Sequence, residues 1–144
     1  MKIAIGNDHA GTEYKNELIV LLKSLGHTVT NHGTDTNDSM DYPDTIHPVA
    51  KQVDKQQVDL GIIICGSGNG ANMTANKHTG VRSALCWNEE IASLARKHNN
   101  ANILSIPARF VSLEEAKKMT LTFIETPFEG GRHQKRIDKI PNCS

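Results

Sequence analysis

The apolar residues of this chain fall into short extended runs that alternate with stripes at helical spacing. Residues 2–6 form the first run, which is rich in β-branched residues and predicts a strand. A stripe at helical spacing then extends to Gly26, and it consists of Tyr14, Leu18, Leu21, Leu22 and Leu25. Residues 27–31 alternate between polar and apolar, which predicts a second strand. The chain therefore begins as strand, helix and strand.

A polar loop separates this unit from the next. Residues 33–43 are rich in turn-forming residues and predict a loop, and apolar residues from Ile46 to Val53 again recur at helical spacing. Leu60 to Ile64 is a continuous apolar run, which is typical of a strand covered on both faces of a parallel sheet. This strand ends at Cys65.

The second half of the chain continues the alternation. We expect, in order, a helix at 71–77, a strand at 81–87, a helix from 88 to about 98, a strand at 102–106, a helix after 112 and a basic helix or arm at 128–140. Two of these helices have start signals, since Asn88 is a favourable N-cap and Ser112 with Glu115 has the spacing of a capping box.

This order of elements predicts an α/β protein. Strands that alternate with helices form right-handed crossovers, hence a parallel sheet of about five strands in a single-domain, doubly wound, Rossmann-like sandwich with a C-terminal basic helix. The 144 residues suit one domain over 1–144. Because such folds bind ligands at the carboxyl ends of their strands, we expect the site at residues 7–9, in the loop after Cys65 and in the segments after the fourth and fifth strands.

Charge and composition narrow the range of partners. Lys plus Arg and Asp plus Glu are both 16, so no overall field attracts nucleic acid or an anionic membrane, and we expect neither as a partner. The apolar run at the N-terminus is too short for a signal peptide and no later stretch could span a membrane, so we expect a cytoplasmic protein.

The three cysteines, Cys65, Cys86 and Cys143, are odd in number and widely spaced, which indicates reduced thiols rather than disulfides or a zinc site.

The most informative segment is the glycine-rich loop from Cys65 to Gly70, between a buried strand and a helix. Alternating glycines let successive backbone N–H groups face an oxyanion, and the helix dipole adds positive potential. A tight strand-to-helix turn would also use these glycines. The loop therefore predicts an anion site, with a purely structural turn as the alternative.

Three other classes share part of this pattern. The residues after Cys65 fit G-x-G-x-x-A, so a dinucleotide-binding module with Glu89 or Glu90 on the ribose stays open, although its fingerprint would follow the third strand rather than the first. A cysteine phosphatase is excluded, because its loop needs an arginine at the position where this chain has Ala71. A signalling receiver domain would need a phosphoacceptor carboxylate where this chain has Cys65.

Two titratable residues are candidates for acid–base chemistry. A thiol at a helix N-terminus ionises more readily than an ordinary thiol, which suits Cys65 as a nucleophile or general base. Cys86, in an apolar strand, and Cys143, in the tail, are expected to be inert. His98 lies at a predicted helix C-terminus, where the dipole favours the imidazolium and so a proton donor.

The other candidates would bind substrate. His9 follows Asp8 in the expected crevice. Arg132 and Arg136 are four residues apart, so a helix would present both guanidinium groups to one phosphate, with a solvated basic face as the alternative. The remaining histidines are expected at the surface: His27, His32, His47, His78 and His133.

Five motifs, in this order, resemble the ribose-5-phosphate isomerase type B family over nearly the whole chain. They are residues 7–11 (NDHAG), 65–70 (CGSGNG), 75–77 (ANK), 96–99 (RKHN) and 130–134 (GGRHQ). The related galactose-6-phosphate isomerase divides such motifs between two subunits, whereas one chain carries them all here. The resemblance therefore implies interconversion of ribose 5-phosphate and ribulose 5-phosphate, without metal or organic cofactor.

The resemblance also implies roles for individual residues. It implies a homodimer, which could pair into a dimer of dimers, with active sites shared between chains. Cys65 is then the base, His98 the acid that helps to open the furanose ring, and Ser67 assists the opening. The phosphorylated sugar would be bound by Asp8, His9, Tyr42, Gly66, Gly68, Asn69, Gly70, Asn99, Arg109, Arg132 and Arg136. Three departures from the family pattern, at Asn7, Ser67 and Pro107, remove no essential group.

The implied reaction is a proton transfer. A base removes the proton from C2 of the open aldose and returns it to C1 through a cis-enediolate, whose charge the N–H groups of the glycine-rich loop would stabilise. The segment around Asp41, Tyr42 and Pro43 could shape a pocket for five- or six-carbon sugars. An isomerase of allose 6-phosphate or galactose 6-phosphate is therefore the alternative.

Overall fold

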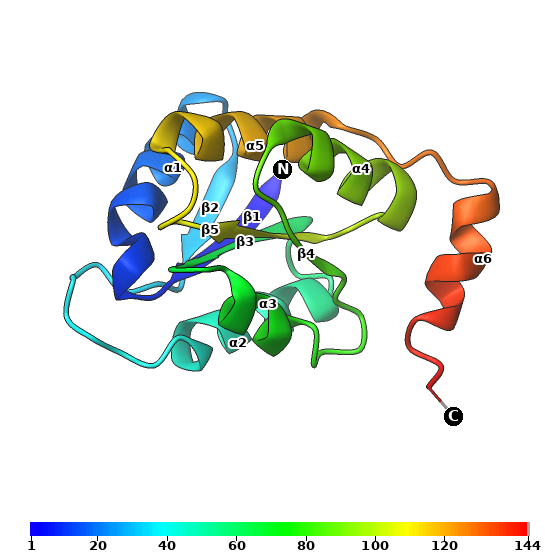
Figure 1. Cartoon of the computed structure of the whole chain (residues 1–144), viewed down its shortest axis with the longest axis horizontal. Helices are drawn as coiled ribbons and strands as arrows, with labels where there is room; N and C mark the ends of the chain where they lie inside the picture. Colours follow the sequence, from blue (N-terminus) through cyan, green and yellow to red (C-terminus); the bar gives the residue numbers. More distant parts are fainter. Residues whose placement is uncertain (144) are drawn as a thin grey trace.

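An all-parallel sheet of five strands forms the middle layer of the structure (Figure 1). The computed structural model describes residues 1–143. The strands lie in the order β2-β1-β3-β5-β4 and comprise β1 (Lys2–Asn7), β2 (Thr28–Asn31), β3 (Leu60–Cys65), β4 (Ser83–Leu85) and β5 (Ile103–Pro107). The predicted Rossmann-like α/β class and parallel sheet are confirmed.

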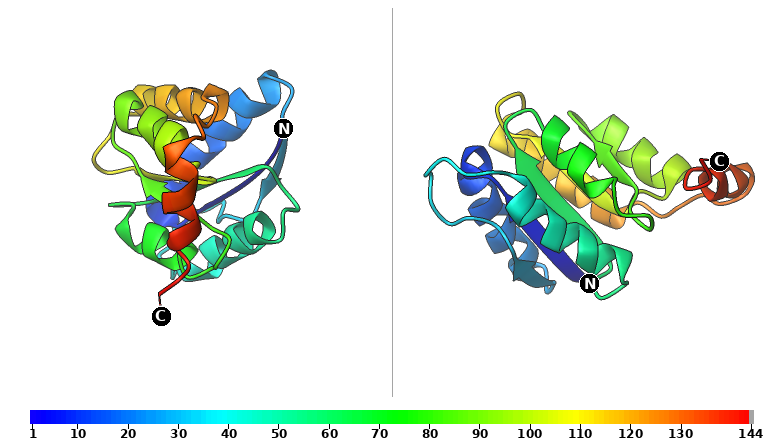
Figure 2. Two further views of the ribbon diagram at one scale, coloured as in Figure 1. Left: turned by 90° about the vertical axis from the view of Figure 1, so that its right-hand side faces the viewer. Right: turned by 90° about the horizontal axis from the view of Figure 1, so that it is seen from below.

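Helices cover both faces of the sheet (Figure 2). One face carries α1 (Thr12–Ser24), α4 (Glu89–Asn99) and α5 (Leu113–Glu125), and the other carries α2 (Pro43–Asp54) and α3 (Asn69–Ala75). A short 3-10 helix, η1 (His9–Gly11), follows β1. The last helix, α6 (Arg132–Lys139), lies outside both layers at one end of the molecule. In the part of the chain described, no helix combines the length and the apolar character needed to cross a bilayer.

The alternation of side chains along the central strand explains the two helical layers. On β3, Ile62 and Ile64 pack with α1, α4 and α5, while Ile63 and Cys65 pack with α2 and α3. Every residue of β3 is buried. This confirms the two-sided burial expected from its continuous apolar run.

Two local predictions need correction. β4 has only three residues, fewer than predicted, because it is an edge strand and the backbone N–H of Arg82 donates to the side chain of Asn102 (2.7 Å) instead of to a strand. At α5, Ser112 accepts from the Glu115 N–H as expected (3.1 Å), but the Glu115 carboxylate accepts from the Glu89 N–H (3.2 Å). Glu115 therefore joins the starts of α5 and α4 rather than completing a capping box.

Buried polar side chains fix the loop between β2 and α2. The Lys15 side chain is fully buried and forms an ion pair with Asp35, whose carboxylate is mostly exposed. The pKa of Asp35 is lowered chiefly by its hydrogen bond with Lys15 and then by one with Asn31. The Asn7 amide donates to the Thr34 carbonyl (3.1 Å). These contacts hold the loop against the carboxyl end of β1.

We predict that Asp35→Asn lowers the free energy of unfolding at pH 7 by about 1–3 kcal/mol, because it leaves a buried ammonium group without its counter-charge. The folded pKa of Asp35 lies below its unfolded value, so the stabilisation is present above about pH 4 and is lost as the pH falls through the folded pKa. The difference between variant and wild type, measured by urea unfolding, should therefore shrink at acid pH.

Asp38→Asn is the matched control for this prediction. Asp38 lies in the same loop, is exposed, and forms no ion pair among residues 1–143. If both substitutions change the unfolding free energy equally at pH 7, the ion pair between Lys15 and Asp35 does not stabilise the fold.

Candidate active site

The carboxyl ends of β1 and β3 lie side by side in the middle of the sheet. The chain leaves β1 toward β2 on one side and leaves β3 toward β4 and β5 on the other, so the strand order reverses between them. Ligand crevices of open α/β sheets lie at such a point. The Asp8 N–H donates to the Ile64 carbonyl here (3.1 Å), which keeps the two strand ends together.

Asp8 and His9 are oriented by the backbone around them. Asp8 is buried, and its carboxylate accepts from the Ala10 N–H (2.9 Å), where it caps η1. Nδ1 of His9 accepts from the Met40 N–H (3.3 Å), so the proton of a neutral ring lies on Nε2. His9 is thus tied to the loop that precedes α2.

The glycine-rich loop after β3 turns sharply and leaves several N–H groups without a protein partner. Gly68 has a left-handed φ of 76°, and its carbonyl accepts from the buried Ser105 hydroxyl (2.8 Å). The backbone N–H groups of Gly66, Ser67 and Gly68 donate to no other group within the described chain. Cys65, at the end of β3, is buried. The loop can therefore donate several hydrogen bonds to an anion at the strand end that carries the thiol.

Two further predicted residues border this loop. The Arg109 N–H donates to the Gly66 carbonyl (3.0 Å), and the Arg109 side chain lies against Gly66. The Tyr42 ring lies so close to Gly70 that a Cβ there would be 2.4 Å from Cζ of the ring. The carboxyl edge of the sheet thus gathers most of the predicted site residues of one chain: Asp8, His9, Tyr42, Cys65, Gly66, Ser67, Gly68, Asn69, Gly70 and Arg109.

The remaining predicted residues lie at the opposite edge of the sheet. α4 starts after the carboxyl end of β4 and runs back along the sheet, so its last residues, His98 and Asn99, lie near the amino ends of the strands. α6 packs against α4 (Figure 1) and carries Arg132 and Arg136 on its exposed side. A single chain therefore does not bring His98 to Cys65.

A partly buried arginine fixes the end of α4. Arg96 donates to two backbone carbonyls beyond the helix, those of Ala101 and Thr126. Burial lowers the pKa of Arg96, and the charge of Arg82 lowers it further, but a guanidinium stays charged at neutral pH. The turn that carries His98 is therefore held by charge-assisted hydrogen bonds.

One histidine at this end of the molecule was not predicted as part of a site. The expectation of a surface position for His133 is wrong: it is buried, and its ring stacks on that of His98 with centroids 4.6 Å apart and planes 16° from parallel. Nε2 of His133 lies 3.7 Å from a Glu129 carboxylate oxygen. The signal in the sequence was the four-residue spacing of His133 and Ile137, which are the buried residues of α6.

His98, Glu129 and His133 also form the one group among residues 1–143 whose ligand atoms lie close enough for a metal ion, within 4.8 Å of one another. An imidazole nitrogen offers its lone pair in the plane of the ring. Two nearly parallel, stacked rings cannot both direct lone pairs at one ion without turning. The geometry therefore favours a stack over a metal centre.

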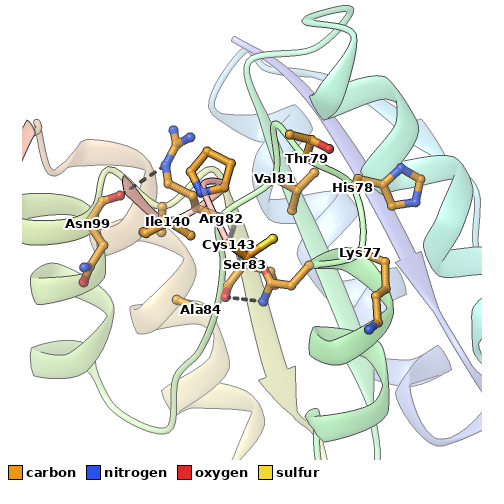
Figure 3. Close-up of a pocket in the computed structure, with 13 residues that line it drawn as sticks. Lys77, His78, Thr79, Val81, Arg82, Ser83, Ala84, Asn99, Ile140 and Cys143 are labelled. Atoms are coloured by element: carbon orange, nitrogen blue, oxygen red, sulfur yellow. Dashed lines mark hydrogen bonds between the residues drawn. The ribbon is translucent and has the colours of Figure 1, made fainter. Parts of the chain in front are cut away.

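A cavity of about 530 Å³ lies beside Asn99 rather than beside Cys65 (Figure 3). Its walls are the end of α3, the segment that leads into β4, and the tail after α6, with the exposed apolar side chain of Ile140. Arg82 lines it and donates through Nε to the Asn99 carbonyl (3.2 Å). The cavity is a groove between the tail and the rest of the chain, separate from the carboxyl edge of the sheet.

The second cysteine has an environment unlike that of a reactive thiol. Cys86 is fully buried, and burial raises the pKa of its thiol to about 12. A thiol that stays protonated is a weak nucleophile. This agrees with the expectation that Cys86 is inert.

Comparison with known proteins points to one family. The family described as Ribose/Galactose Isomerase matches residues 3–140. The chain is 40% identical over 139 residues to ribose-5-phosphate isomerase B of Escherichia coli (strain K12), covering 96% of this chain and 93% of that protein. It is 46% identical over 142 residues to the probable ribose-5-phosphate isomerase B of Mycoplasma genitalium, covering 96% of this chain and 92% of that protein.

Solved structures show the same similarity in three dimensions. Ribose-5-phosphate isomerase B from Clostridium thermocellum superimposes with a TM-score of 0.97 at 44% identity, covering 99% of this chain and 96% of that chain. The crystal structure of the Mycoplasma genitalium enzyme with bound ribulose-5-phosphate superimposes with a TM-score of 0.95 at 45% identity, covering 98% of this chain and 94% of that chain.

We predict that Gly68→Ala lowers the free energy of unfolding by roughly 2–5 kcal/mol. The left-handed φ costs about 1–2 kcal/mol with a side chain, and overpacking adds about 1–3 kcal/mol, because the new Cβ would lie 2.5 Å from the Leu85 side chain and 3.2 Å from the Pro107 nitrogen. Gly26→Ala is the matched control, since its φ is also left-handed (87°) but nothing lies within 4 Å of its Cβ. If urea unfolding shows the same loss of unfolding free energy for Gly68→Ala and Gly26→Ala, the close approach of Gly68 to Leu85 does not contribute to the loss.

Proposed function

Because the chain belongs to the ribose/galactose isomerase family over residues 3–140, we propose that it interconverts ribose 5-phosphate and ribulose 5-phosphate. The observation that carries the proposal is its full-length similarity to an enzyme structure with bound ribulose-5-phosphate. The charged phosphate of such a substrate does not cross membranes unaided, so the proposal includes the cytoplasm as the place of the reaction. A six-carbon sugar phosphate is the second candidate, since the family description also includes galactose isomerases.

In this proposal Cys65 is the base that moves the proton. Its thiolate takes the proton from C2 of the open aldose and returns it to C1, while the proton of the C2 hydroxyl passes to O1. The intermediate is a cis-enediolate. The N–H groups of Gly66, Ser67 and Gly68, which have no partner among residues 1–143, would donate to its oxygens, where negative charge develops.

The other residues of the carboxyl edge would position the sugar. Asp8 and His9, which the backbone already orients, would bind its hydroxyl groups, and Tyr42 would close the side of the pocket at Gly70. A sugar held in this way reacts faster because the entropy of orientation is lost on binding rather than in the transition state.

Ring opening and phosphate binding use the second group of residues. His98 would protonate the ring oxygen of the furanose while the anomeric hydroxyl loses its proton to solvent as the aldehyde forms, with assistance from Ser67. Arg132 and Arg136 would bind the phosphate through charge-assisted hydrogen bonds. The family resemblance implies that Asn99, and Arg109 from the carboxyl edge, complete the contacts to the substrate.

We propose that a second copy of the chain completes the site. Support comes from the separation of the two groups, since Cys65 ends a strand at one edge of the sheet and His98 ends a helix at the other. A homodimer that places the α4 end of one chain over the glycine-rich loop of its partner would form two identical sites, as two-fold symmetry requires.

The experiment that tests the proposed reaction is a coupled assay of the pure protein with ribose 5-phosphate, allose 6-phosphate and galactose 6-phosphate. We expect turnover to be fastest with ribose 5-phosphate. Preference for a six-carbon sugar would favour the second candidate. Binding of a nicotinamide dinucleotide without any isomerisation would overturn both.

For the base, we predict that Cys65→Ser folds like the wild type but isomerises at least about 10²-fold more slowly, because a serine hydroxyl is a far weaker acid than a thiol. The measurement is the exchange of solvent deuterium into the carbon next to the carbonyl, which reports proton transfer alone. Cys143→Ser, which changes an exposed cysteine, is the control and should keep full exchange. Exchange at the wild-type rate in Cys65→Ser would make Asp8 the candidate base.

For the shared site, we predict that mixing inactive Cys65→Ala protein with inactive His98→Ala protein restores activity. Each hybrid dimer contains one site with both wild-type groups, so an equal mixture that exchanges subunits at random should recover roughly a quarter of the wild-type activity. Activity is measured at the time of mixing and again after subunit exchange has been verified with isotopically labelled chains. Absence of activity after verified exchange would rule out a site built from two chains.

A further inference from the structure

We infer that His133 is a positioning residue, which holds the His98 imidazole in the orientation needed to open the sugar ring; this inference rests on the proposed function. Nothing in that function requires a histidine at position 133, since the proposed acid is His98 and the phosphate ligands are the neighbouring arginines. Yet His133 is buried against His98, where an apolar side chain would be the ordinary choice.

The contact between the two rings restrains His98. Their centroids are 4.6 Å apart and their planes differ by 16°, so the flat face of His133 lies along the flat face of His98. Rotation of the His98 ring about its Cβ–Cγ bond would drive its edge into His133. A ring that acts as a general acid must present one nitrogen to one oxygen, and the stack fixes the plane in which that nitrogen lies before substrate arrives.

His133 is itself restrained on its other sides. Its Nε2 lies 3.7 Å from the Glu129 carboxylate, and the Phe128 ring lies at a tilt of 55° to it, with centroids 6.5 Å apart. The His133 ring therefore lies between the His98 ring, the Glu129 carboxylate and the Phe128 ring, which together limit its movement. An aliphatic residue would fill the same space but would offer His98 no flat surface.

The backbone ties this cluster to the end of α4. The Glu129 N–H donates to the Lys97 carbonyl (3.2 Å), immediately before His98, and the His133 N–H donates to the Gly130 carbonyl (3.3 Å). The left-handed φ values of Gly130 and Gly131, 69° and 59°, turn the chain so that α6 begins with His133 facing His98. The stack is therefore set by contacts within one chain and does not require a partner.

The test uses a chemical difference between the two substrates. Ribose 5-phosphate closes into a furanose through its C4 hydroxyl, whereas ribulose 5-phosphate cannot form a five-membered ring because its O5 carries the phosphate. Deuterium exchange into C1 of ribulose 5-phosphate therefore reports enolisation without ring opening, and consumption of ribose 5-phosphate reports both steps. A residue that acts through the ring-opening acid should affect the second measurement only.

We expect His133→Leu, which keeps the buried volume and removes the flat ring, to slow consumption of ribose 5-phosphate roughly 10-fold or more. Exchange into ribulose 5-phosphate should stay within about 2-fold of the wild type, since its proton transfer needs no ring-opening acid. His133→Phe restores a flat ring and should recover ribose 5-phosphate turnover to within about 3-fold. His133→Gln, which keeps a polar partner for Glu129 but has no ring, should show the same selective loss as His133→Leu and replaces it if that protein unfolds.

Ile137→Ala is the matched control, because Ile137 is the other buried residue of α6 and does not belong to the stack. It loosens the helix and should raise KM for both sugars, without a selective loss for ribose 5-phosphate. Equal losses in both measurements for His133→Leu would mean that His133 only holds α6 in place, which overturns the inference while the proposed function stands. If the wild-type protein converts neither sugar, the proposed function fails and the inference fails with it.

Discussion

Parallel strand pairing separates the two groups of candidate site residues in this molecule. Parallel strands can be joined only by crossovers that return the chain to the starting edge of the sheet, so the five strands end at one edge and the helices that follow them end at the other. Asp8 and the glycine-rich loop lie at the first edge because each follows a strand directly. His98 lies at the second because it closes a helix. Which groups can meet within one chain is therefore decided by topology before any side chain is considered.

Polar contacts, rather than the apolar layers, determine the shape of the loops at the carboxyl edge. The two core clusters are built almost wholly from strand and helix residues. The loops are held by directed bonds that reach out of these elements, from the Lys15 ammonium to Asp35, from the Asn7 amide to the Thr34 carbonyl and from the Ser105 hydroxyl to the Gly68 carbonyl. A buried donor that loses its acceptor costs free energy, so each bond favours a single loop conformation.

The features that the sequence predicts well depend on signals within a few residues. The apolar run of β3 requires burial on both faces, and Asn88 caps α4 by accepting from the Ile91 N–H (3.0 Å). The features that it predicts poorly depend on neighbours distant along the chain. The Glu115 carboxylate turns to the Glu89 N–H, and β4 is shortened because Asn102 competes for the Arg82 N–H. Neither contact can be predicted from the spacing of residues along the chain.

The candidate site divides in the same way. Its motifs identify individual residues, but the burial of His133 follows from the approach of α6 to α4, which no motif specifies. Likewise, the residue types of Cys65 and His98 suggest their chemistry, while their placement at opposite edges follows from the parallel sheet and the end of α4 rather than from any motif. The spacing of these residues along the chain therefore does not indicate that they act together, and only the family resemblance groups them.

The last helix, α6, is held by fewer buried contacts than the helices that cover the sheet. Only His133 and Ile137 of this helix are buried, and the two glycines before it have open space where side chains would be. Released glycines regain more backbone freedom than other residues, and segments with few buried contacts open at lower free energy than the core. We therefore expect warming to detach α6 before the sheet melts. In that interval the α/β core would be intact while Arg132 and Arg136, the proposed phosphate ligands, would have no fixed place, so we expect the proposed activity to be lost before the fold.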